Sequence, residues 1–164
     1  MDKKRLTLVI LGLVAIVGIV LGVDFWQRQQ AAALTPADMP PGSIPIFMDG
    51  KFVASFVPDD LSQLPDASFV DDEEGKTQQG WMLNDVLLLY IKESKLKGGT
   101  QITVSSSSRE KSKTLVWADV NNVENMVMFD LSGRGTLKLV SKIPGFDLRD
   151  DWVQDVDRID VKKP

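Results

Sequence analysis

Near the N-terminus, an uncharged run extends from Leu6 to Val23, and Thr7 is its only polar side chain. A helix over this run would be about 27 Å long, which is close to the hydrocarbon thickness of a bilayer. The run is apolar on every helical face, whereas a surface helix of a globular domain is apolar on one stripe only. We therefore predict a single N-terminal transmembrane helix within residues 1–26.

The residues that flank this run indicate its orientation. Positions 3–5 are basic, and Phe25 and Trp26 follow the run where interfacial aromatic residues are common. The alternative is a cleaved signal peptide, for which residues 31–34 offer small side chains. The apolar run is longer than the usual signal core of about 7–15 residues, so we favour an uncleaved anchor. This predicts a single-pass protein of the cell membrane, held by residues 6–23, with a cytoplasmic N-terminus and a periplasmic or extracellular C-terminal domain.

The rest of the chain divides into a linker and one domain. Residues 27–43 are rich in Gln, Ala and Pro and show no strand pattern, and Pro40 and Pro41 would stiffen their end. The apolar runs typical of a packed core begin near Ile44. We assign residues 27–43 to a tether and residues 44–164 to a single modest domain.

Two missing residue types limit the chemistry of this chain. It contains no cysteine and no histidine. Disulfides, thiolate ligands, histidine ligands and histidine-based catalytic triads are therefore excluded. The formal net charge of the chain is −4, whereas binding of nucleic acid requires clustered Lys and Arg side chains. We therefore expect no nucleic-acid partner. Catalysis would depend on carboxylates, Lys, Arg, Ser or Tyr, or on a bound cofactor.

The first half of the domain predicts strands joined by short turns. Asp49-Gly50 separates two short apolar runs, and this dipeptide suits a type I′ hairpin, whose two central residues need positive φ. Residues 58–65 predict one or two helical turns. Residues 67–80 predict a strand, an acidic turn and a polar strand.

The most apolar stretch of the domain, residues 80–91, predicts its principal helix. Asp85 falls in the first turn, where the helix dipole favours a carboxylate. Leu88 and Leu89 widen the apolar stripe, which predicts that strands cover the helix on more than one side. The stripe itself has helical spacing and consists of Leu83, Val86, Leu87, Tyr90 and Ile91.

The second half again predicts mainly strands. Residues 100–108 and 113–120 are strand-like, residues 125–141 predict a hairpin that turns at Gly133-Arg134-Gly135, and residues 153–161 predict the last strand. The expected fold class is α+β: a mostly β domain of mixed or antiparallel strands with one principal helix, preceded by the transmembrane helix.

Two arginines are candidate anion contacts. Arg134 lies between two glycines at a hairpin tip, where backbone amides and a guanidinium can hold an anion, and Arg109 lies in the polar segment 105–113. We predict Arg109 and Arg134 as cofactor-binding residues; the alternative is that each is an ordinary exposed arginine. A catalytic Ser-Lys dyad in residues 105–113 would need a desolvated lysine, but this segment is polar. We therefore expect a mobile loop there.

Two acidic segments are candidates for cation binding. Residues 71–74 read DDEE, and six aspartates lie between positions 147 and 160. Neither segment has the ligand and glycine spacing of a calcium loop, so we predict no metal site. Arg149 and Arg158 are expected to pair with neighbouring carboxylates. No catalytic residue is predicted.

Four segments of the domain carry a recognisable pattern. In order along the chain, they are Asp60-Leu61 with Leu64-Pro65; Gly80 with Leu83, Asp85 and Leu87; Gly135 with Leu137 to Val140; and Trp152-Val153 with Ile159 and Val161. This pattern resembles the oxidoreductase molybdopterin-binding domain of the sulfite-oxidase type, which has a helix entry of the form G-x-x-L-x-D-L-L and closes with a strand of the form W-V-x-x-v-x-x-I-x-V. The resemblance covers most of residues 44–162 and implies a small version of that fold.

The departures from this family concern its cofactor. In the family, a cysteine thiolate binds molybdenum, and histidine and arginines hold the pterin and its phosphate. This chain has neither cysteine nor histidine. A molybdenum–pterin cofactor is therefore not expected, and the identity of any cofactor is left open.

Two functions follow from this reading. We favour a non-catalytic binding or assembly module, in which the domain serves a membrane protein partner such as a membrane redox complex. The alternative is an oxidoreductase that binds a pterin or another anionic cofactor without a cysteine ligand. The alternative requires a concave pocket lined by Arg or Lys.

Overall fold

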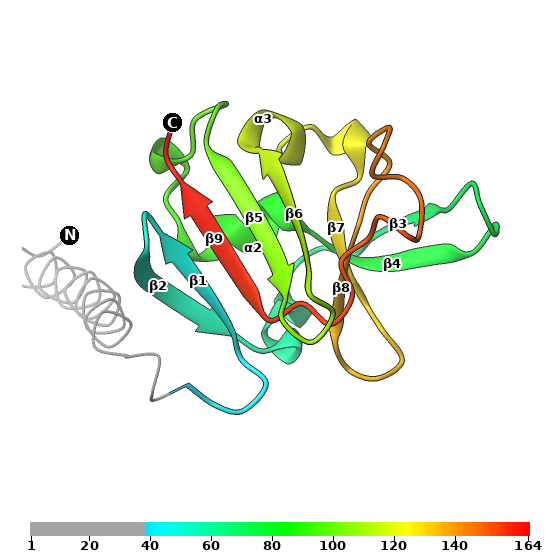
Figure 1. Ribbon diagram of the computed structural model, residues 1–164, viewed down its shortest axis with the longest axis horizontal. Coiled ribbons are helices and arrows are strands. Elements are labelled where there is room, and N and C mark those ends of the chain that lie inside the picture. The colour runs from blue at the N-terminus through cyan, green and yellow to red at the C-terminus, as the bar shows by residue number, and fades with distance from the viewer. Residues whose placement is uncertain (1–38) are drawn as a thin grey trace, which may run out of the picture. The chain divides into compact units, whose positions relative to one another are not determined.

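The computed structural model describes residues 39–164 (Figure 1). The predicted transmembrane helix in residues 1–26 and the linker up to residue 38 lie outside the described residues. Within 39–164, no helix has the length and apolar character needed to cross a membrane.

Short strands are the predominant regular elements of the described residues, and the helices between them are short. The elements are β1 (Ile44–Met48), β2 (Lys51–Phe56), the 3₁₀ helix η2 (Pro58–Gln63), β3 (Ala67–Val70), β4 (Thr77–Met82), α2 (Leu83–Tyr90), η3 (Glu93–Lys95), β5 (Gln101–Ser106), β6 (Lys111–Val116), α3 (Trp117–Val120), η4 (Val123–Asn125), β7 (Met128–Leu131), β8 (Leu137–Val140) and β9 (Arg158–Lys162).

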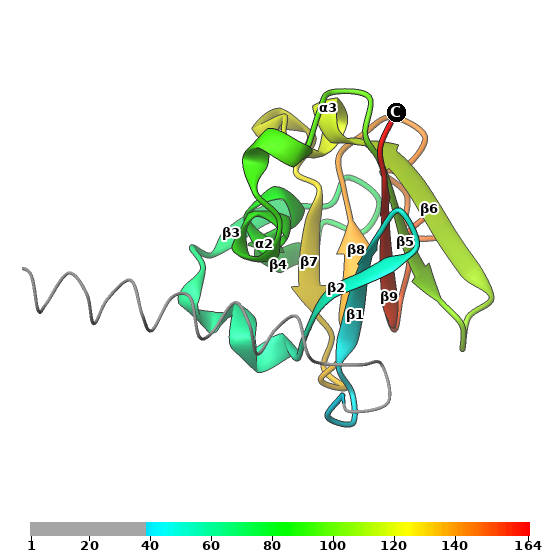
Figure 2. The same ribbon diagram turned by 90° about the vertical axis from the view of Figure 1, so that its left-hand side faces the viewer.

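The strands form two sheets. The first is mixed, with the order β2-β1-β9-β5-β6, and its β1–β9 pair is parallel. The second is antiparallel, with the order β3-β4-β7-β8. Figure 2 shows β4, β7 and α2 on one side of the domain and β9, β5 and β6 on the other. The domain is thus mostly β with mixed and antiparallel pairing, as the sequence predicted.

The hairpin predicted at Asp49-Gly50 is confirmed. Met48 pairs with Lys51 across the two turn residues, whose φ angles are 51° and 76°. Asparagine, aspartate and glycine tolerate this left-handed region best, which explains why a two-residue loop forms here. The hairpin at 133–135 is also confirmed, because β7 and β8 pair antiparallel on either side of it.

Helix α2 packs through one face only. Leu83, Val86 and Leu87 are completely buried, as the apolar stripe predicted. Leu88 and Leu89 are 38% and 40% exposed, so the prediction that strands cover more than one side of this helix is wrong. The reason is tertiary: α2 follows directly from β4 and lies against β4 and β7, which leaves its outer face to solvent (Figure 2).

The entry to α2 is sealed by packing. A Cβ atom on Gly80 would lie 1.8 Å from the carbonyl oxygen of Phe129 on the neighbouring strand. The amide of Leu83 donates to the carbonyl of Val127, 2.9 Å away, which fixes the start of the helix beside β7. These close backbone contacts explain why a glycine stands at position 80.

Aromatic side chains join the two sheets and α2 into one core. The ring of Phe56 on β2 stacks on Tyr90 at 5.8 Å between centroids and lies 6.5 Å from Phe129 on β7. Burial raises the pKa of Tyr90 to about 12. Trp152, in the long connection between β8 and β9, meets Phe69 of β3 edge-on at 6.4 Å.

Three predicted boundaries in the second half are corrected. Residues 117–120 were predicted as part of a strand but form α3. The amides of Trp117 and Ala118 donate hydrogen bonds to the carbonyls of Thr100 and Gly98, where the strand ends. The segment 105–113 is mostly strand, with only residues 107–110 in a turn, and not the expected loop.

The last strand begins at Arg158 and not at residue 153. Val153 makes a single bridge to Leu139, and the chain then bends at Asp155, whose φ of 54° interrupts an extended strand.

Candidate functional site

The structure brings the two predicted anion contacts, Arg109 and Arg134, to one carboxylate of the chain itself. Arg109 Nε lies 2.7 Å from Asp155 Oδ2, and Arg134 Nη2 lies 3.0 Å from Asp155 Oδ1. The hydroxyl of Thr136 donates to the same carboxylate over 2.7 Å. Asp155 therefore occupies the position between the arginines that an external anion was expected to fill.

Asp155 links three loops. Arg109 belongs to the β5–β6 turn, Arg134 and Thr136 to the β7–β8 turn, and Asp155 to the connection before β9. The Thr136 hydroxyl, followed by the Arg109 guanidinium, lowers the pKa of Asp155 below its usual value of 3.8. These contacts hold Asp155, a non-glycine residue, in the left-handed region of φ. They also fix Arg109 to the connection between β8 and β9, in which Asp155 lies.

We predict that Asp155→Asn lowers the free energy of unfolding by about 1–2 kcal/mol near neutral pH, because a charged acceptor with three donors is lost. Asparagine tolerates the left-handed region, so the change isolates the charge. Because the folded pKa of Asp155 is lowered, its contribution is present above pH 3.8 and is lost as the pH falls through the folded value. Urea unfolding of the full chain at a series of pH values measures this effect.

The difference from wild type should therefore shrink below pH 3.8. Asp66→Asn is the control, because Asp66 is exposed and makes no side-chain hydrogen bond or ion pair with residues 39–164. A difference for Asp155→Asn that does not change with pH would contradict the electrostatic role of this carboxylate.

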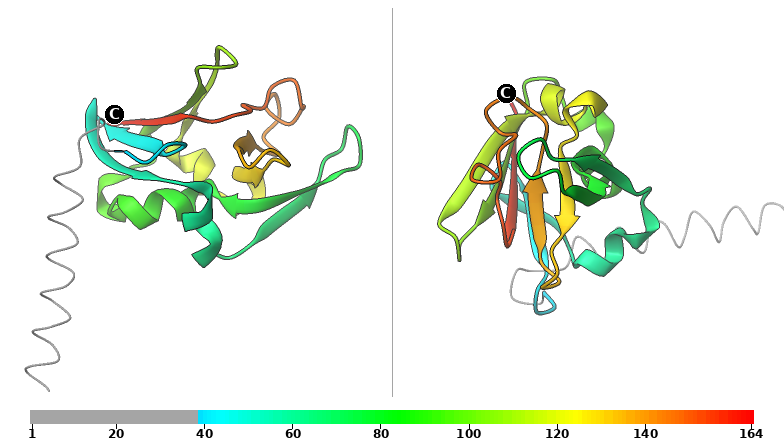
Figure 3. Two further views of the ribbon diagram at one scale, coloured as in Figure 1. Left: turned by 90° about the horizontal axis from the view of Figure 1, so that it is seen from below. Right: turned by 90° about the vertical axis from the view of Figure 1, so that its right-hand side faces the viewer.

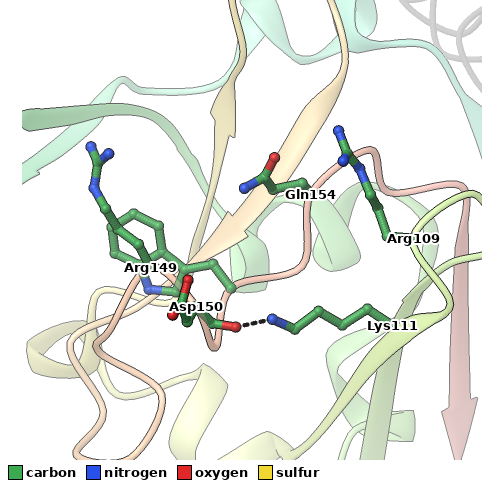
Figure 4. Close-up of a pocket in the computed structure, with 6 residues that line it drawn as sticks. Arg109, Lys111, Arg149, Asp150 and Gln154 are labelled. Carbon is green, nitrogen blue, oxygen red and sulfur yellow. Dashed lines mark hydrogen bonds between the residues drawn. The ribbon is translucent and has the colours of Figure 1, made fainter.

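A pocket of about 210 Å³ lies beside Arg109. Arg109 and Lys111 of the β5–β6 hairpin lie on one side of it, Arg149 and Asp150 lie on the other, and Gln154 lies between them (Figure 4). The Nζ atom of Lys111 donates to the backbone carbonyl of Asp150 on the opposite side of the pocket (Figure 4). We call this the basic pocket; its lining residues are Arg109, Lys111, Arg149, Asp150, Trp152 and Gln154.

Arg149 is fixed by the acidic turn between β3 and β4. Its Nη1 lies 2.8 Å from Glu74 Oε2, and its Nη2 lies 3.4 Å from Asp71 Oδ2. Asp71 is buried, and its pKa is lowered chiefly by the backbone N–H of Glu74. The prediction that Arg149 pairs with neighbouring carboxylates is wrong in its partners, which are distant in sequence. Arg158 does pair with its neighbour Asp160, at 2.6 Å.

Trp152 forms a wall of the basic pocket. Its side chain is 2% exposed, and its ring lies 5.1 Å from Lys138 Nζ and 5.9 Å from Arg149 Cζ. Within residues 39–164, its Nε1–H has no hydrogen-bond acceptor, and neither has the Nε–H of Arg149. A buried N–H without an acceptor is rare in folded proteins and calls for an explanation.

The donor set of the basic pocket suits an anion. Three of its six lining residues carry a positive charge, and Asp150 is the one carboxylate among them. No group of three acidic side chains in residues 39–164 converges to form a candidate metal site. The pocket thus offers hydrogen-bond donors and positive charge, which can bind and orient a ligand that carries acceptors.

Among the lining residues of the basic pocket, only Arg109 was predicted from the sequence as a binding residue. Lys111 was visible in the same polar segment, but it was assigned to a loop. Trp152 was considered as part of the family resemblance, and Arg149 was expected to pair with nearby aspartates. The helix entry at residues 80–85 does not line the basic pocket.

Comparison of the sequence with protein-family models and with curated proteins gave no significant match.

Proposed function

We propose that this chain is a single-pass membrane protein whose domain, outside the cytoplasm, is a non-catalytic binding module. In this proposal, the helix in residues 6–23 anchors the chain, and the basic pocket receives an anionic group of a membrane protein partner. The proposal includes an accessory role in a membrane redox complex. The observation that carries it is the basic pocket, whose cations the domain holds in place.

The size of the pocket favours binding over cofactor chemistry. Pockets that enclose drug-sized ligands usually have volumes of about 300–1,000 Å³. The basic pocket, at about 210 Å³, matches a side chain or a terminal group better than a pterin nucleotide. The arginines also have protein partners: Arg109 pairs with Asp155, and Arg149 with Glu74. Such preorganised charges suit recognition of a partner.

The fold assignment belongs to the same proposal. We propose that residues 44–164 are a reduced version of the sulfite-oxidase-type domain that lacks the cofactor ligands. In support, three of the matching segments fall in defined elements: Asp60-Leu61 in η2, Gly80 to Leu87 across the junction of β4 and α2, and Gly135 to Val140 in the β7–β8 turn and β8.

The alternative function is an oxidoreductase that holds an anionic cofactor without a cysteine ligand. It also requires a pocket lined by Arg or Lys, and the basic pocket meets that requirement. Metal and pterin content separate the two functions. We expect the full chain, purified from membranes in mild detergent, to contain neither in stoichiometric amount. A stoichiometric molybdenum–pterin content would overturn the binding-module proposal.

A charge-reversal pair tests the binding surface. In Lys111→Glu with Gln154→Glu, the pocket becomes acidic while both arginines keep their ion pairs. We expect a membrane protein that co-purifies with the wild-type chain to be lost from this variant. The control is Lys92→Glu with Ser94→Glu, two exposed positions that give the same change in net charge. Equal retention by both variants would overturn the role of the pocket.

A further inference from the structure

We infer that the outer edge of β3 is a docking site for an extended segment of another protein, which adds a strand to the second sheet. The added strand carries Lys or Arg opposite Asp66 and Asp72. This inference goes beyond the proposed function, because β3 does not line the basic pocket. Two observations carry it: the backbone groups of β3 that point away from the sheet, and the aspartates at the two ends of this strand.

The hydrogen-bond register shows which backbone groups of β3 are free. The amide of Asp71 donates to the carbonyl of Lys76, so the odd-numbered residues of β3 exchange hydrogen bonds with β4. The N–H and C=O groups of Ser68 and Val70 therefore point away from β4. Among residues 39–164, β4 is the only strand that pairs with β3. Ser68 and Val70 are exposed, and Val70 is 54% exposed, so their backbone groups are accessible to a new strand.

The other three sheet edges are protected. The edge of β8 is bridged to Val153 in the connection that follows it. On β6, the side chains of Lys111 and Lys113 donate to backbone carbonyls of the same connection. β2 begins at Lys51 and pairs with β1 through an irregular register. Lysines, bulges and covering loops are the usual means by which proteins block an edge strand.

β3 has none of these protections. Its sequence, ASFV, contains neither lysine nor proline, and its register with β4 is regular. The β3–β4 hairpin also extends away from the rest of the domain (Figure 3). An open edge of this kind can accept an extended peptide, whose main chain supplies the hydrogen bonds.

Asp66 and Asp72 determine which partner strand fits. Both side chains are exposed, and within residues 39–164 neither forms an ion pair. If two copies of β3 paired antiparallel, with Ser68 opposite Val70, Asp66 of each copy would face Asp72 of the other. Like charges in opposed positions destabilise a strand pair, so a second copy is disfavoured. A strand with two cations six positions apart makes both contacts attractive.

A short peptide with this pattern is the probe. In acetyl-Lys-Thr-Val-Thr-Val-Thr-Lys-amide, the lysines can lie opposite Asp72 and Asp66 while the valines pair with Val70 and Ser68. The peptide is titrated into the ¹⁵N-labelled full chain in nonionic detergent and followed by NMR. We expect saturable downfield shifts of the Ser68 and Val70 amide protons, with a dissociation constant on the order of 1 mM. The amide of Phe69, which already faces β4, should shift less.

Modified peptides separate backbone pairing from charge. N-methylation of the first valine removes a donor that faces Val70, and we expect it to weaken binding about tenfold. N-methylation of the central threonine is the matched control, because its N–H points away from β3, and the affinity should stay the same. A peptide with glutamate in place of both lysines should bind about fivefold more weakly at low ionic strength.

A variant of the chain tests the same edge from the other side. Val70→Pro removes the outward N–H and leaves the hydrogen bonds to β4 in place, because proline is tolerated where an edge N–H faces solvent. We expect it to weaken binding of the lysine peptide about tenfold. Val70→Thr is the control, since it keeps the N–H and a β-branched side chain, and it should bind as wild type does.

The inference fails if the Ser68 and Val70 amides show no saturable shift, if the two N-methylated peptides bind equally, or if the glutamate peptide binds as tightly as the lysine peptide. A wild-type chain that dimerises in sedimentation experiments, with a monomeric Val70→Pro variant, would assign this edge to a second copy and overturn the cationic partner. The basic pocket is tested separately by charge reversal at Lys111 and Gln154, so failure at β3 leaves the proposed function standing.

Discussion

Trp152→Ala is expected to lower the free energy of unfolding of the domain by about 3–5 kcal/mol, the usual range for a buried tryptophan. Trp152 is 2% exposed and meets Phe69 edge-on, and Lys138 Nζ lies 5.1 Å from its ring. Its Nε1–H has no acceptor within residues 39–164, so the variant loses no hydrogen bond. The effect should therefore come from lost packing, from the lost contact between the ring and Lys138, and from the cavity that remains.

Urea unfolding of the full chain in detergent measures this effect through the fluorescence of the remaining tryptophans. Leu148→Ala is the control, because Leu148 lies four positions earlier and is 51% exposed. We expect this control to stay within about 0.5 kcal/mol of wild type. A loss for Trp152→Ala as small as that of the control would show that the connection between β8 and β9 does not pack against β3.

Gly80→Ala should lower the free energy of unfolding by about 3 kcal/mol, at the upper end of the overpacking range. The new methyl group would lie 1.8 Å from the carbonyl oxygen of Phe129 and 3.1 Å from the Cα of Asp130. Both atoms belong to the backbone of β7, which pairs with β4 inside the second sheet. The clash cannot be relieved by a side-chain rotation, so the two strands have to separate.

Gly133→Ala is the matched control for this change. A Cβ atom on Gly133 would meet no atom within 4 Å. Gly133 lies in the β7–β8 turn, so the same chemical change is made in open space, and we expect an effect within about 0.5 kcal/mol. Similar unfolding midpoints for the two variants, measured by urea titration, would contradict the close approach of β4 and β7.

The arrangement of the pocket gives the β3–β4 hairpin a second role. Figures 1 and 3 show this hairpin extending away from the rest of the domain. The acidic turn of this hairpin forms ion pairs with Arg149 through Glu74 and the buried Asp71. The acidic residues at 71–74 thus position Arg149, a cation of the basic pocket, in addition to forming a turn.

Local chemistry explains what could be predicted. The Asp49-Gly50 hairpin was predictable because positive φ at two adjacent residues restricts which residues can stand there. The inner face of α2 was predictable because its leucines and valine recur with the helical period. Leu88 and Leu89 obey the same local rule and were predicted as covered. No local signal shows where the neighbouring strands end, and both residues are exposed.

Such local rules could not predict the basic pocket. Arg109 could be proposed as an anion contact, but its partner Asp155 is 46 residues away in sequence, and Arg149 and Asp71 are 78 residues apart. Which carboxylate meets which guanidinium depends on the loops that the two sheets bring together. The missing acceptor of Trp152 is likewise visible only when all its neighbours are in place.

By itself, the sequence determined the exclusion of cysteine and histidine chemistry, the mostly β character of the domain and the position of its turns. These properties follow from residue types and short spacings, which act over a few residues. The tertiary structure alone decided that Arg109 and Arg134 share Asp155, that the acidic turn holds Arg149, and that Trp152 lies buried beside Lys138 and Arg149. Such contacts join segments that are distant along the chain, so they exist only once the two sheets have packed.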